Sequence, residues 1–202
     1  TYGGATIYRD SWFGWQEIDE IAGAYNIQIT LSHDGKRILV SSGSDWGAEV
    51  HEETNSGWQL VGTRITGVEG SRFGGASAGS SDLSVIAVAS EEEVAVYEQQ
   101  GDAWIRRGTA LTRPVVSADR LPSLDLSDDG KVLATGYQFG NANGDLSGAV
   151  RVHKWEQLGW IQRGGDLYGL PETYGGTSIS LNASGSRLAV SYPGSDANGE
   201  YS

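Results

Sequence analysis

The sequence predicts an all-β fold, and three of its features support this prediction. Short apolar stretches alternate hydrophobic and polar residues with a period of two, as strands with one buried face do. Thirty glycines, together with clusters of Asn, Asp and Ser, separate these stretches, as tight turns between strands require. No stretch has a convincing amphipathic-helix pattern. We therefore expect a single β domain over residues 1–202.

Two independent markers show that the chain consists of repeats. The first is an apolar residue after a polar turn, which recurs after 48, 47 and 55 positions at Ile38, Ile86, Leu133 and Leu188. The second is a tryptophan, which recurs after 43, 46 and 56 positions at Trp15, Trp58, Trp104 and Trp160. Because the spacings change together, the repeats cover approximately 22–66, 67–112, 113–168, and 169–202 together with 1–21.

Each repeat is expected to form four short strands joined by turns. In the third repeat, Asp129-Gly130 and Asn143-Gly144 supply the positive φ that tight hairpin turns require. The strands expected there are 121–127, 132–138, 148–155 and 160–167. The first repeat is expected to have strands at 26–32, 37–43, 47–54 and 58–65, and the second at 75–81, 85–91, 93–100 and 104–111.

Four-stranded repeats of about 40 to 50 residues with glycine and aromatic markers are typical of β-propeller blades. The expected fold is therefore an all-β propeller of four four-stranded blades. The segment 1–21 resembles the second half of a repeat, and 188–202 ends before that half begins, so N- and C-terminal half-blades should complete one blade. Strands 187–193 and 4–11 would then pair, within one chain in preference to between chains, because a chain's own half-blade has the higher local concentration.

Composition excludes several classes of function. Without cysteine the chain has no thiol nucleophile, disulfide or Cys-ligated metal. A net charge of −12 disfavours nucleic acid and anionic membranes as partners. No apolar run approaches the roughly 18 residues of a membrane span, so we expect no membrane insertion. Because methionine is also absent, we expect the chain to derive from a longer precursor.

The sharpest catalytic motif is at residues 75–79, Gly-Ala-Ser-Ala-Gly, which match the G-x-S-x-G pattern of hydrolases around Ser77. That pattern needs a strand leading into a helix, whereas these residues lie on an expected inner strand. His33, His51 and His153 are expected at a turn and on exposed strand faces, not as metal ligands. We therefore expect no catalytic residues and no enzyme.

Other side chains are candidates for binding or modification. Asp125 and Asp129 are expected near one mouth of the axis, where facing carboxylates could act as acid and base. Asn182 begins the sequon Asn-Ala-Ser and is a glycosylation site if the source is eukaryotic and the chain is secreted. The recurring tryptophans should pack between blades. Other aromatics could bind a sugar or a protein: Trp12, Trp46, Tyr137, Trp155 and Tyr192.

Short motifs recur in the order seen in a known family. Phe73-Gly74 and Tyr174-Gly175 precede expected inner strands, Tyr192-Pro193-Gly194 follows a second strand, and 148–152 begins a third strand. In these motifs the chain resembles the FG-GAP repeats of integrin-α-like β-propellers, particularly the extracellular bacterial and algal type. The resemblance covers essentially the whole chain and implies an extracellular or cell-surface location.

The resemblance also implies a calcium loop between the second and third strands of a blade. The corresponding segments keep a glycine but have lost most carboxylates, and their candidate ligands are Asn141, Asn143, Asp145, Asp196 and Asn198. Calcium prefers six to eight oxygens, several of them from carboxylates. We therefore expect no cofactor, with weak calcium binding as the alternative, because clusters of Asn, Asp and Gly also serve as plain turns.

The function expected from the sequence is a non-enzymatic, extracellular structural or adhesive module. Its partner would be a protein or glycan at the cell surface or in the matrix, and the terminal half-blades would allow self-association. Two alternatives stay open. One is a lectin-like, glycan-binding propeller, and the other is a hydrolase of extracellular polysaccharide with acids at the axial funnel.

Overall fold

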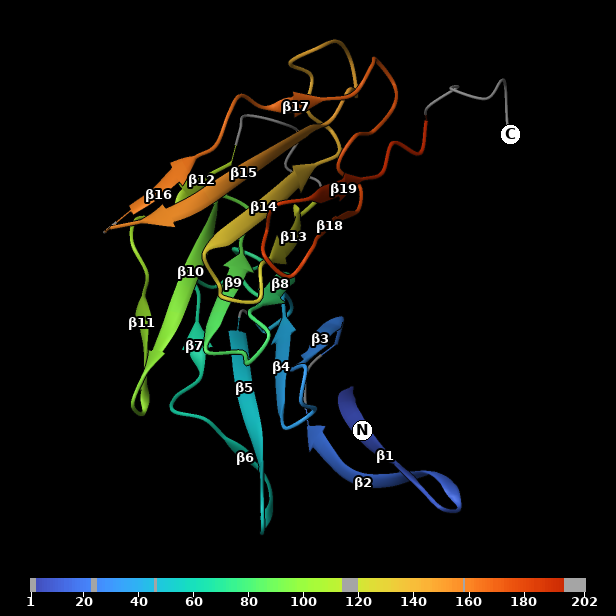
Figure 1. Ribbon diagram of the computed structural model, residues 1–202, viewed down its shortest axis with the longest axis vertical. Helices are drawn as coiled ribbons and strands as arrows, with labels where there is room; N and C mark the ends of the chain where they lie inside the picture. The colour runs from blue at the N-terminus through green and yellow to red at the C-terminus, as the bar shows by residue number, and fades with distance from the viewer. Residues whose placement is uncertain (1–2, 23–24, 46, 114–119, 158, 195–202) are drawn as a thin grey trace.

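The computed structural model describes residues 3–22, 25–45, 47–113, 120–157 and 159–194. Within these ranges the regular structure is entirely β, with five antiparallel sheets and no helix. Figure 1 shows the sheets following one another from the N-terminal hairpin to the C-terminal one. This arrangement confirms the all-β propeller fold expected from the sequence. Over the same ranges, no helix is long and apolar enough to cross a membrane.

Three sheets are complete blades with four main strands in chain order, and a two-residue strand pairs with the start of the third strand. Blade 1 consists of β3 (Ile27–Leu31), β4 (Arg37–Ser42), β5 (Gly47–Thr54), β6 (Gly57–Leu60) and β7 (Ile65–Thr66). Blade 2 consists of β8 (Ala76–Gly79), β9 (Val85–Ala89), β10 (Glu93–Gln100), β11 (Ala103–Arg106) and β12 (Leu111–Thr112). Blade 3 consists of β13 (Ser123–Leu126), β14 (Val132–Tyr137), β15 (Ala149–Glu156), β16 (Gly159–Gln162) and β17 (Leu167–Tyr168).

The fourth strand of each blade is shorter than the sequence predicted. The strand expected over 58–65, for example, ends at Leu60. The chain leaves the sheet soon afterwards at Gly62, Gly108 or Gly164, whose φ values are 70°, 78° and 76°. Positive φ is incompatible with an extended strand and is readily adopted only by glycine. The two-residue strand begins after this excursion.

The terminal segments form two separate hairpins. In the described residues β1 (Gly4–Ser11) pairs only with β2 (Gly14–Ala22), and β18 (Ile179–Leu181) pairs only with β19 (Leu188–Val190). The blade that we expected these hairpins to form within one chain is therefore not formed. The sheets form a curved, open row around the propeller axis. The two terminal hairpins lie at the two ends of this row (Figure 1).

The first hairpin is a longer ribbon than its counterparts. In blade 1 the fourth strand begins at residue 57, and residue 66 pairs with the start of the third strand. In the hairpin the corresponding residues are 14 and 22, so this segment is one residue shorter. Without this residue the described hairpin has no positive-φ glycine at which the chain leaves the sheet. As a result β2 continues along β1, with a bulge where the register shifts between Ile7 and Tyr8.

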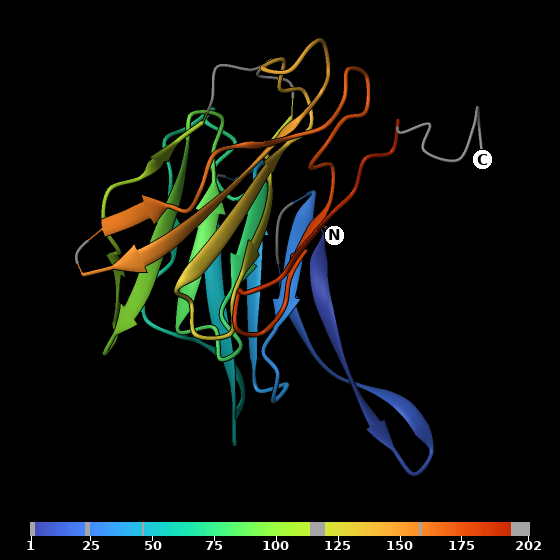
Figure 2. The same ribbon diagram turned by 45° about the horizontal axis from the view of Figure 1, so that its top comes forward.

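Apolar side chains are buried between neighbouring blades, whose sheets pack face to face (Figure 2). Leu39 of blade 1 and Ile86 of blade 2 belong to one cluster, and both are fully buried. Ala87 of blade 2 and Leu133 of blade 3 belong to the next cluster and are also fully buried. Because blade 2 contributes to both clusters, the core runs continuously through the three complete blades.

Two of the recurring tryptophans join blades through their indole nitrogens, as expected. Trp104 Nε1 donates to the carbonyl of Val61 at 3.0 Å, and Trp160 Nε1 donates to that of Arg107 at 2.9 Å. Each bond runs from one blade to the blade before it. Trp15 has no preceding blade in the described residues and is 74% exposed.

Backbone hydrogen bonds also connect the turns between the first and second strands. The N–H of His33 donates to the carbonyl of Ser81 at 2.8 Å, that of Ser81 donates to Asp128 at 3.1 Å, and that of Asp128 donates to Ala183 at 2.9 Å. These bonds pass from blade 1 to the C-terminal hairpin in order. They hold the inner strands close together at one end of the axis.

Candidate functional site

The inner strands surround a hollow at the propeller axis. The hollow has a volume of about 330 Å³, and β3, β8, β13 and β18 all contribute to it because the first strand of each blade lies nearest the axis. Its polar side chains are one amide and four hydroxyls, from Gln28, Ser77, Ser123, Thr177 and Ser178. Among the described residues that line it there is no acidic, basic or histidine side chain.

Hydrogen bonds between neighbouring repeats hold two of these hydroxyl groups in place. Ser41 Oγ of blade 1 donates to Ser77 Oγ of blade 2 at 2.8 Å. Ser123 Oγ donates to the carbonyl of Gly176 at 2.8 Å. A hydroxyl can donate once and accept twice, so each group keeps capacity for a ligand. Gln28 is exposed, and its amide can both donate and accept.

Asp125 lies on β13, beside the hollow, but its carboxylate is used within the fold. Oδ2 accepts from the N–H of Leu181 at 2.6 Å, and Oδ1 accepts from the N–H of Leu126 at 2.9 Å. Burial raises the pKa of Asp125 above its ordinary value despite these two hydrogen bonds, which act to lower it. The carboxylate therefore joins β13 to β18, and no second acid faces it among the described lining residues.

Asp129, the other acid that we considered for catalysis, stabilises its own turn. Its Oδ1 accepts from Ser127 Oγ at 2.8 Å and from the N–H of Lys131 at 3.0 Å. Burial acts to raise the pKa of Asp129, but these hydrogen bonds and the Lys131 charge outweigh it, so the pKa is lowered. Asp125 and Asp129 are thus both engaged in local structure and do not form the facing pair that a hydrolase needs.

The G-x-S-x-G match lies on an inner strand, as the sequence indicated. Residues 76–79 form β8, and the chain continues through a polar turn into β9, not into a helix. The strained strand-to-helix turn that exposes a nucleophilic serine is therefore missing at Ser77. Ser77 contributes instead to the polar lining of the hollow.

The asparagine-rich loop after β14 is held by its own side chains. Asn141 Oδ1 accepts from the N–H of Leu146 at 2.9 Å. Asn143 Nδ2 donates to the carbonyl of Gly169 at 3.0 Å, which ties the loop to the segment after β17. Both amides therefore have the structural role of turn residues.

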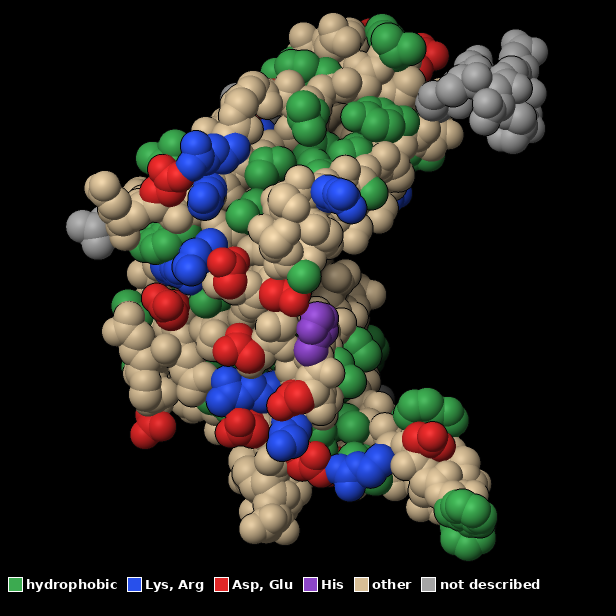
Figure 3. All heavy atoms as spheres, viewed as in Figure 1, with side chains coloured by type: hydrophobic (Ala, Val, Ile, Leu, Met, Phe, Trp, Pro, Cys, Tyr) green, Lys and Arg blue, Asp and Glu red, His purple; other side chains and the backbone are tan. Residues whose placement is uncertain are grey.

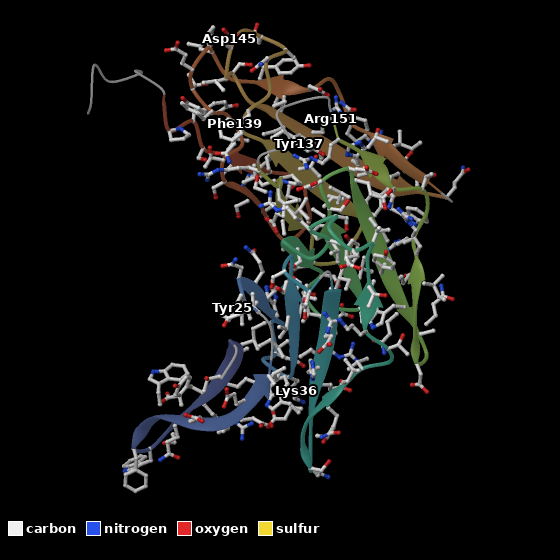
Figure 4. All side chains as sticks on the ribbon, turned by 180° about the vertical axis from the view of Figure 1, so that it is seen from behind. Tyr25, Lys36, Tyr137, Phe139, Asp145 and Arg151 are labelled. Atoms are coloured by element: carbon white, nitrogen blue, oxygen red, sulfur yellow. The ribbon has the colours of Figure 1, made fainter. Side chains whose placement is uncertain are left out.

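The remaining calcium candidates do not complete a ligand set in the described part of the chain. Asp145 is exposed, and its backbone carbonyl accepts from the N–H of Glu172 at 2.7 Å. Figure 4 shows Asp145 at the far end of blade 3, away from Tyr25 and Lys36. Asp196 and Asn198 lie outside the described residues. Weak calcium binding stays an alternative to the expectation of no cofactor.

The histidines differ from expectation in their burial. His153 is only 8% exposed, because the third strands are covered by neighbouring blades, and burial lowers its pKa. The side chain of His51 is only 14% exposed, and its Nε2 lies 3.0 Å from Glu49 Oε2. His33 lies exposed in a turn, as predicted. Over the described ranges no group of three His, Asp or Glu residues is arranged to hold a metal ion.

Asn182 lies in an exposed turn, where the sequon was expected. Its Oδ1 accepts from the N–H of Arg187 at 2.8 Å, and its Nδ2 donates to Ser184 Oγ at 3.1 Å. Asn182 thus holds the turn as Ser127 does in blade 3. Its glycosylation stays a prediction.

The aromatic candidates separate into buried and exposed groups. Tyr137 is only 3% exposed, and Trp155 packs against Trp160 with ring centroids 5.5 Å apart, so both belong to the framework. Trp12 and Phe13 are 96% and 87% exposed at the turn between β1 and β2. Figure 3 shows hydrophobic side chains at the far end of this hairpin.

The last two aromatic candidates are Tyr192 and Trp46. Tyr192 is half-buried, beyond β19. Trp46 lies outside the described residues.

A second cavity, of about 460 Å³, lies between the end of β2 and blade 1, near Tyr25 (Figure 4). Its charged side chains, one arginine and two acids, form ion pairs with one another. Arg64 lies 2.6 Å from an Asp45 carboxylate oxygen and 3.3 Å from one of Glu49. A hydrogen bond with His51 lowers the pKa of Glu49. Because the one arginine here is held by two carboxylates, whereas hydroxyl and amide groups from four inner strands line the axial hollow, the axial hollow is the stronger candidate for binding a ligand.

Most of the residues that line the hollow were not predicted from the sequence, because the candidates were chosen among charged, nucleophilic and aromatic side chains. Gln28, Ser123, Thr177 and Ser178 carry neither property. A usable signal was present, since Gln28 is a polar residue between two isoleucines on a strand nearest the axis. Polar residues at such positions in several repeats would have indicated a polar axis.

Comparisons with known proteins show the fold. No family model matches the chain, and no curated protein matches it significantly. Among solved structures, it is similar to a putative 6-phosphogluconolactonase from Bacteroides uniformis (12% identity, TM-score 0.66) and to another from Bacteroides fragilis (14%, 0.65); each match covers 93% of this chain and 57% of the other. Hsv2 of Kluyveromyces lactis is 20% identical with a TM-score of 0.57, over 87% of this chain and 49% of Hsv2. The chain thus spans about half the length of these propellers.

The resemblance to FG-GAP repeats is wrong, because the similar structures are propellers of a different family. The structure also shows that the two motif pairs are not equivalent. The N–H of Gly74 donates to the carbonyl of Ala89 in β9 at 3.0 Å. The corresponding bond in the C-terminal hairpin goes to the carbonyl of Ser191 at 3.1 Å, and its donor is Gly176, not Gly175. The pairs at 73–74 and 174–175 are therefore out of register by one residue.

Proposed function

We propose that the axial hollow binds a neutral, polyhydroxylated ligand of the sugar class, and that the chain acts as a binding protein and not as an enzyme. The observation that carries this proposal is the lining of hydroxyl and amide groups, without a charged side chain among the described residues. Hydroxyls and amides both donate and accept, as the hydroxyls of a sugar do. The volume of about 330 Å³ is at the small end of ligand sites, which favours one or two sugar rings.

The absence of charge in the described lining argues for binding without catalysis. Hydrolysis of a glycoside needs a carboxylic acid and a carboxylate on either side of the bond, and general acid–base catalysis needs a titratable group within hydrogen-bond reach. Asp125, the nearest candidate along β13, is engaged with the N–H groups of Leu126 and Leu181. This favours the glycan-binding alternative over the hydrolase.

The names of two similar structures support the proposal of a sugar-related ligand. Two of them are described as putative 6-phosphogluconolactonases, a name that refers to the lactone of a phosphorylated sugar acid. A phosphate group is usually held by Lys, Arg or clustered backbone N–H groups. The described lining of this hollow has no Lys or Arg, so we expect an unphosphorylated sugar to bind better than a phosphorylated one.

Saturation-transfer NMR tests this proposal, with glucose, galactose, mannose, gluconate and 6-phosphogluconate as probes. Gln28→Ala removes an amide from the hollow, and Gln28→Trp fills the space. Gln59→Ala and Gln59→Trp are matched controls, because Gln59 is exposed on the outer strand β6. We expect transfer to at least one neutral sugar, weakened at least about tenfold by both Gln28 variants and unchanged in the controls.

Three outcomes contradict the proposal. Lack of transfer to every sugar removes the ligand class, and equal effects of the Gln28 and Gln59 variants remove the site. Stronger binding of 6-phosphogluconate than of gluconate assigns a phosphorylated ligand instead. A gluconolactone hydrolysis assay tests the second part, since turnover above the spontaneous rate makes the protein an enzyme.

The adhesive role, the extracellular location and a cell-surface partner stay predictions from the sequence. The function that the geometry supports best is ligand binding at the axis. Self-association is considered separately, because it concerns other surfaces of the protein.

A further inference from the structure

Neighbouring blades meet through two unlike faces. In the cluster between blades 2 and 3, the inner strands of blade 2 contribute Ala78 and Ala87, and blade 3 contributes Leu126 and Leu133. Ala78 and Ala87 lie opposite each other in the β8–β9 ladder. At this junction the surface of blade 2 at the places of Ala78 and Ala87 is a small face, and the surface of blade 3 that carries the leucines is a bulky face. The corresponding surfaces also meet between blades 1 and 2, although there Leu39 takes the place of Ala87 and packs against Ile86.

The bulky face of blade 1 is only half covered. Ile38 and Val40 are buried against the β1–β2 hairpin. Ile29 and Leu31, nearer the axis, are 58% and 55% exposed, whereas Leu126, which takes the place of Leu31 in blade 3, is 6% exposed. The hairpin corresponds to the third and fourth strands of a blade, so it lacks the inner strands that would cover this apolar strip.

The other end of the row presents the matching surface. Ser180 lies opposite Ala189 in the β18–β19 ladder, at the place of Ala78 and Ala87 in blade 2. Both residues are exposed in the described structure. Because β18 and β19 correspond to the first and second strands of a blade, they are the elements that the first hairpin lacks, and their small face is free.

The strand edges also match. Within the described residues β1 and β19 each have one edge without a partner strand. In blade 3 the second and third strands pair with Leu133 opposite His153. By the repeat, β19 corresponds to β14 and β1 corresponds to β15, so the same ladder would place Leu188 opposite Tyr8. A free edge of this kind is a template for an added strand.

We propose that a second copy of this chain fills the gap: β18–β19 of one copy adds to β1–β2 of its partner and completes a four-stranded blade. The new ladder joins β19 to β1, and the small face formed by Ser180 and Ala189 covers Ile29 and Leu31 of the partner. Backbone hydrogen bonds fix the register, and burial of the two apolar side chains contributes to the affinity.

One residue pair in this ladder predicts a substitution that should strengthen the association. Blade 1 places Arg37 opposite Glu52, with Arg37 Nε 2.9 Å from a carboxylate oxygen. The corresponding pair in the new blade is Arg187 opposite Arg9. Like charges directly opposite one another weaken a strand pair, so Arg187→Glu should strengthen the association. Nonspecific aggregation would have no reason to respond in this way.

Sedimentation equilibrium of the 202-residue chain over a wide range of concentrations tests the proposal. We expect masses above the monomer that rise with concentration, with association several-fold tighter for Arg187→Glu. Leu31→Asp should weaken association at least about tenfold, since it places a charge in the covered strip. Ile161→Asp is the matched control, because Ile161 is 50% exposed on the outer strand β16. Leu31 is already exposed in the monomer, so its variant should fold.

Cysteine pairing tests the register directly, because the natural chain contains no cysteine. A mixture of Tyr8→Cys and Leu188→Cys chains should form disulfide-linked pairs, since residues directly opposite in a ladder are within reach of a disulfide. Either variant alone should not. The proposal is overturned if wild type and Arg187→Glu stay monomeric at every concentration, if Leu31→Asp and Ile161→Asp act equally, or if the mixture cross-links no better than each variant alone.

Discussion

Replacing Asp125 by Ala would remove both acceptor atoms of its side chain, one of which connects β13 to β18. Oδ2 accepts from the N–H of Leu181 at 2.6 Å, and Oδ1 accepts from the N–H of Leu126 at 2.9 Å. A hydrogen bond to a charged group contributes about 1.5–3 kcal/mol net, and the partial burial of this carboxylate offsets part of the two contributions. We expect Asp125→Ala to lower the free energy of unfolding by about 2 kcal/mol.

Asp125→Asn should be milder. The amide oxygen can replace one acceptor, and the uncharged group avoids the burial cost that raises the pKa of Asp125. We expect a loss below about 1 kcal/mol at neutral pH. The pH dependence has a definite sign. Because the folded pKa lies above the unfolded value, near 4, the folded state holds this proton more tightly, and the contribution of Asp125 to stability falls as pH rises between the two values. This slope should be absent in Asp125→Asn.

Urea unfolding and amide hydrogen exchange provide the measurements. The midpoint should fall in Asp125→Ala with little change in slope, and the amide of Leu181 should lose protection first. Ser180→Ala is the control on the same strand, because Ser180 is exposed. Our account of this carboxylate is refuted if Asp125→Ala stays within about 0.5 kcal/mol of wild type, or if Asp125→Asn is as damaging as Asp125→Ala.

Three further predictions concern core packing, backbone conformation and acid stability. Leu133→Ala should cost about 3–4 kcal/mol in urea unfolding, because Leu133 is fully buried between blades; a loss below about 1 kcal/mol would contradict this packing. Gly148→Ala should cost at least about 2 kcal/mol by the same assay, since Gly148 has φ +71° and a Cβ there would overlap the carbonyl oxygen of Gly175; a neutral variant would show that the close approach of these two residues is wrong. Burial acts to raise the pKa of Asp166, but hydrogen bonds from Arg151 and other groups lower it overall, so its contribution to stability should be present above about pH 4 and be lost as pH falls through the folded pKa. Urea unfolding across this range should show the loss in wild type and not in Asp166→Asn.

The parts of the fold that could be predicted are those with strong local signals at both ends. The strands expected at 47–54 and 93–100 have the observed bounds Gly47–Thr54 and Glu93–Gln100, because a turn directly follows each one. The fourth strands were predicted too long, since the sequence shows Gly62 but not that its φ is positive. Strands of two residues, such as β7, are too short to give a pattern at all.

Prediction of the site failed for a different reason. The sequence motif at Ser77 was rejected as catalytic, and Asp125 and Asp129 were considered only for the hydrolase alternative. The structure engages the two acids in hydrogen bonds that hold β18 and a turn. The axial lining instead combines residues from four strands that are far apart in sequence, among them Gln28 and Ser178. Such a site is formed by the curvature of the row of blades, and no local pattern reports that curvature.

The unlike faces of the blades determine how copies of the chain can associate. The contact that we propose joins the small face of β18–β19 to the bulky face of blade 1, so the two partners contribute different surfaces. Such a contact cannot have twofold symmetry across a single interface, and each pair of copies retains one free small face and one free bulky face. A second contact between the same two copies closes a ring, whereas contacts with further copies give larger rings or a filament. The rotation from one blade to the next therefore decides between a closed assembly and an open one, because the new blade repeats the geometry of the blades beside it.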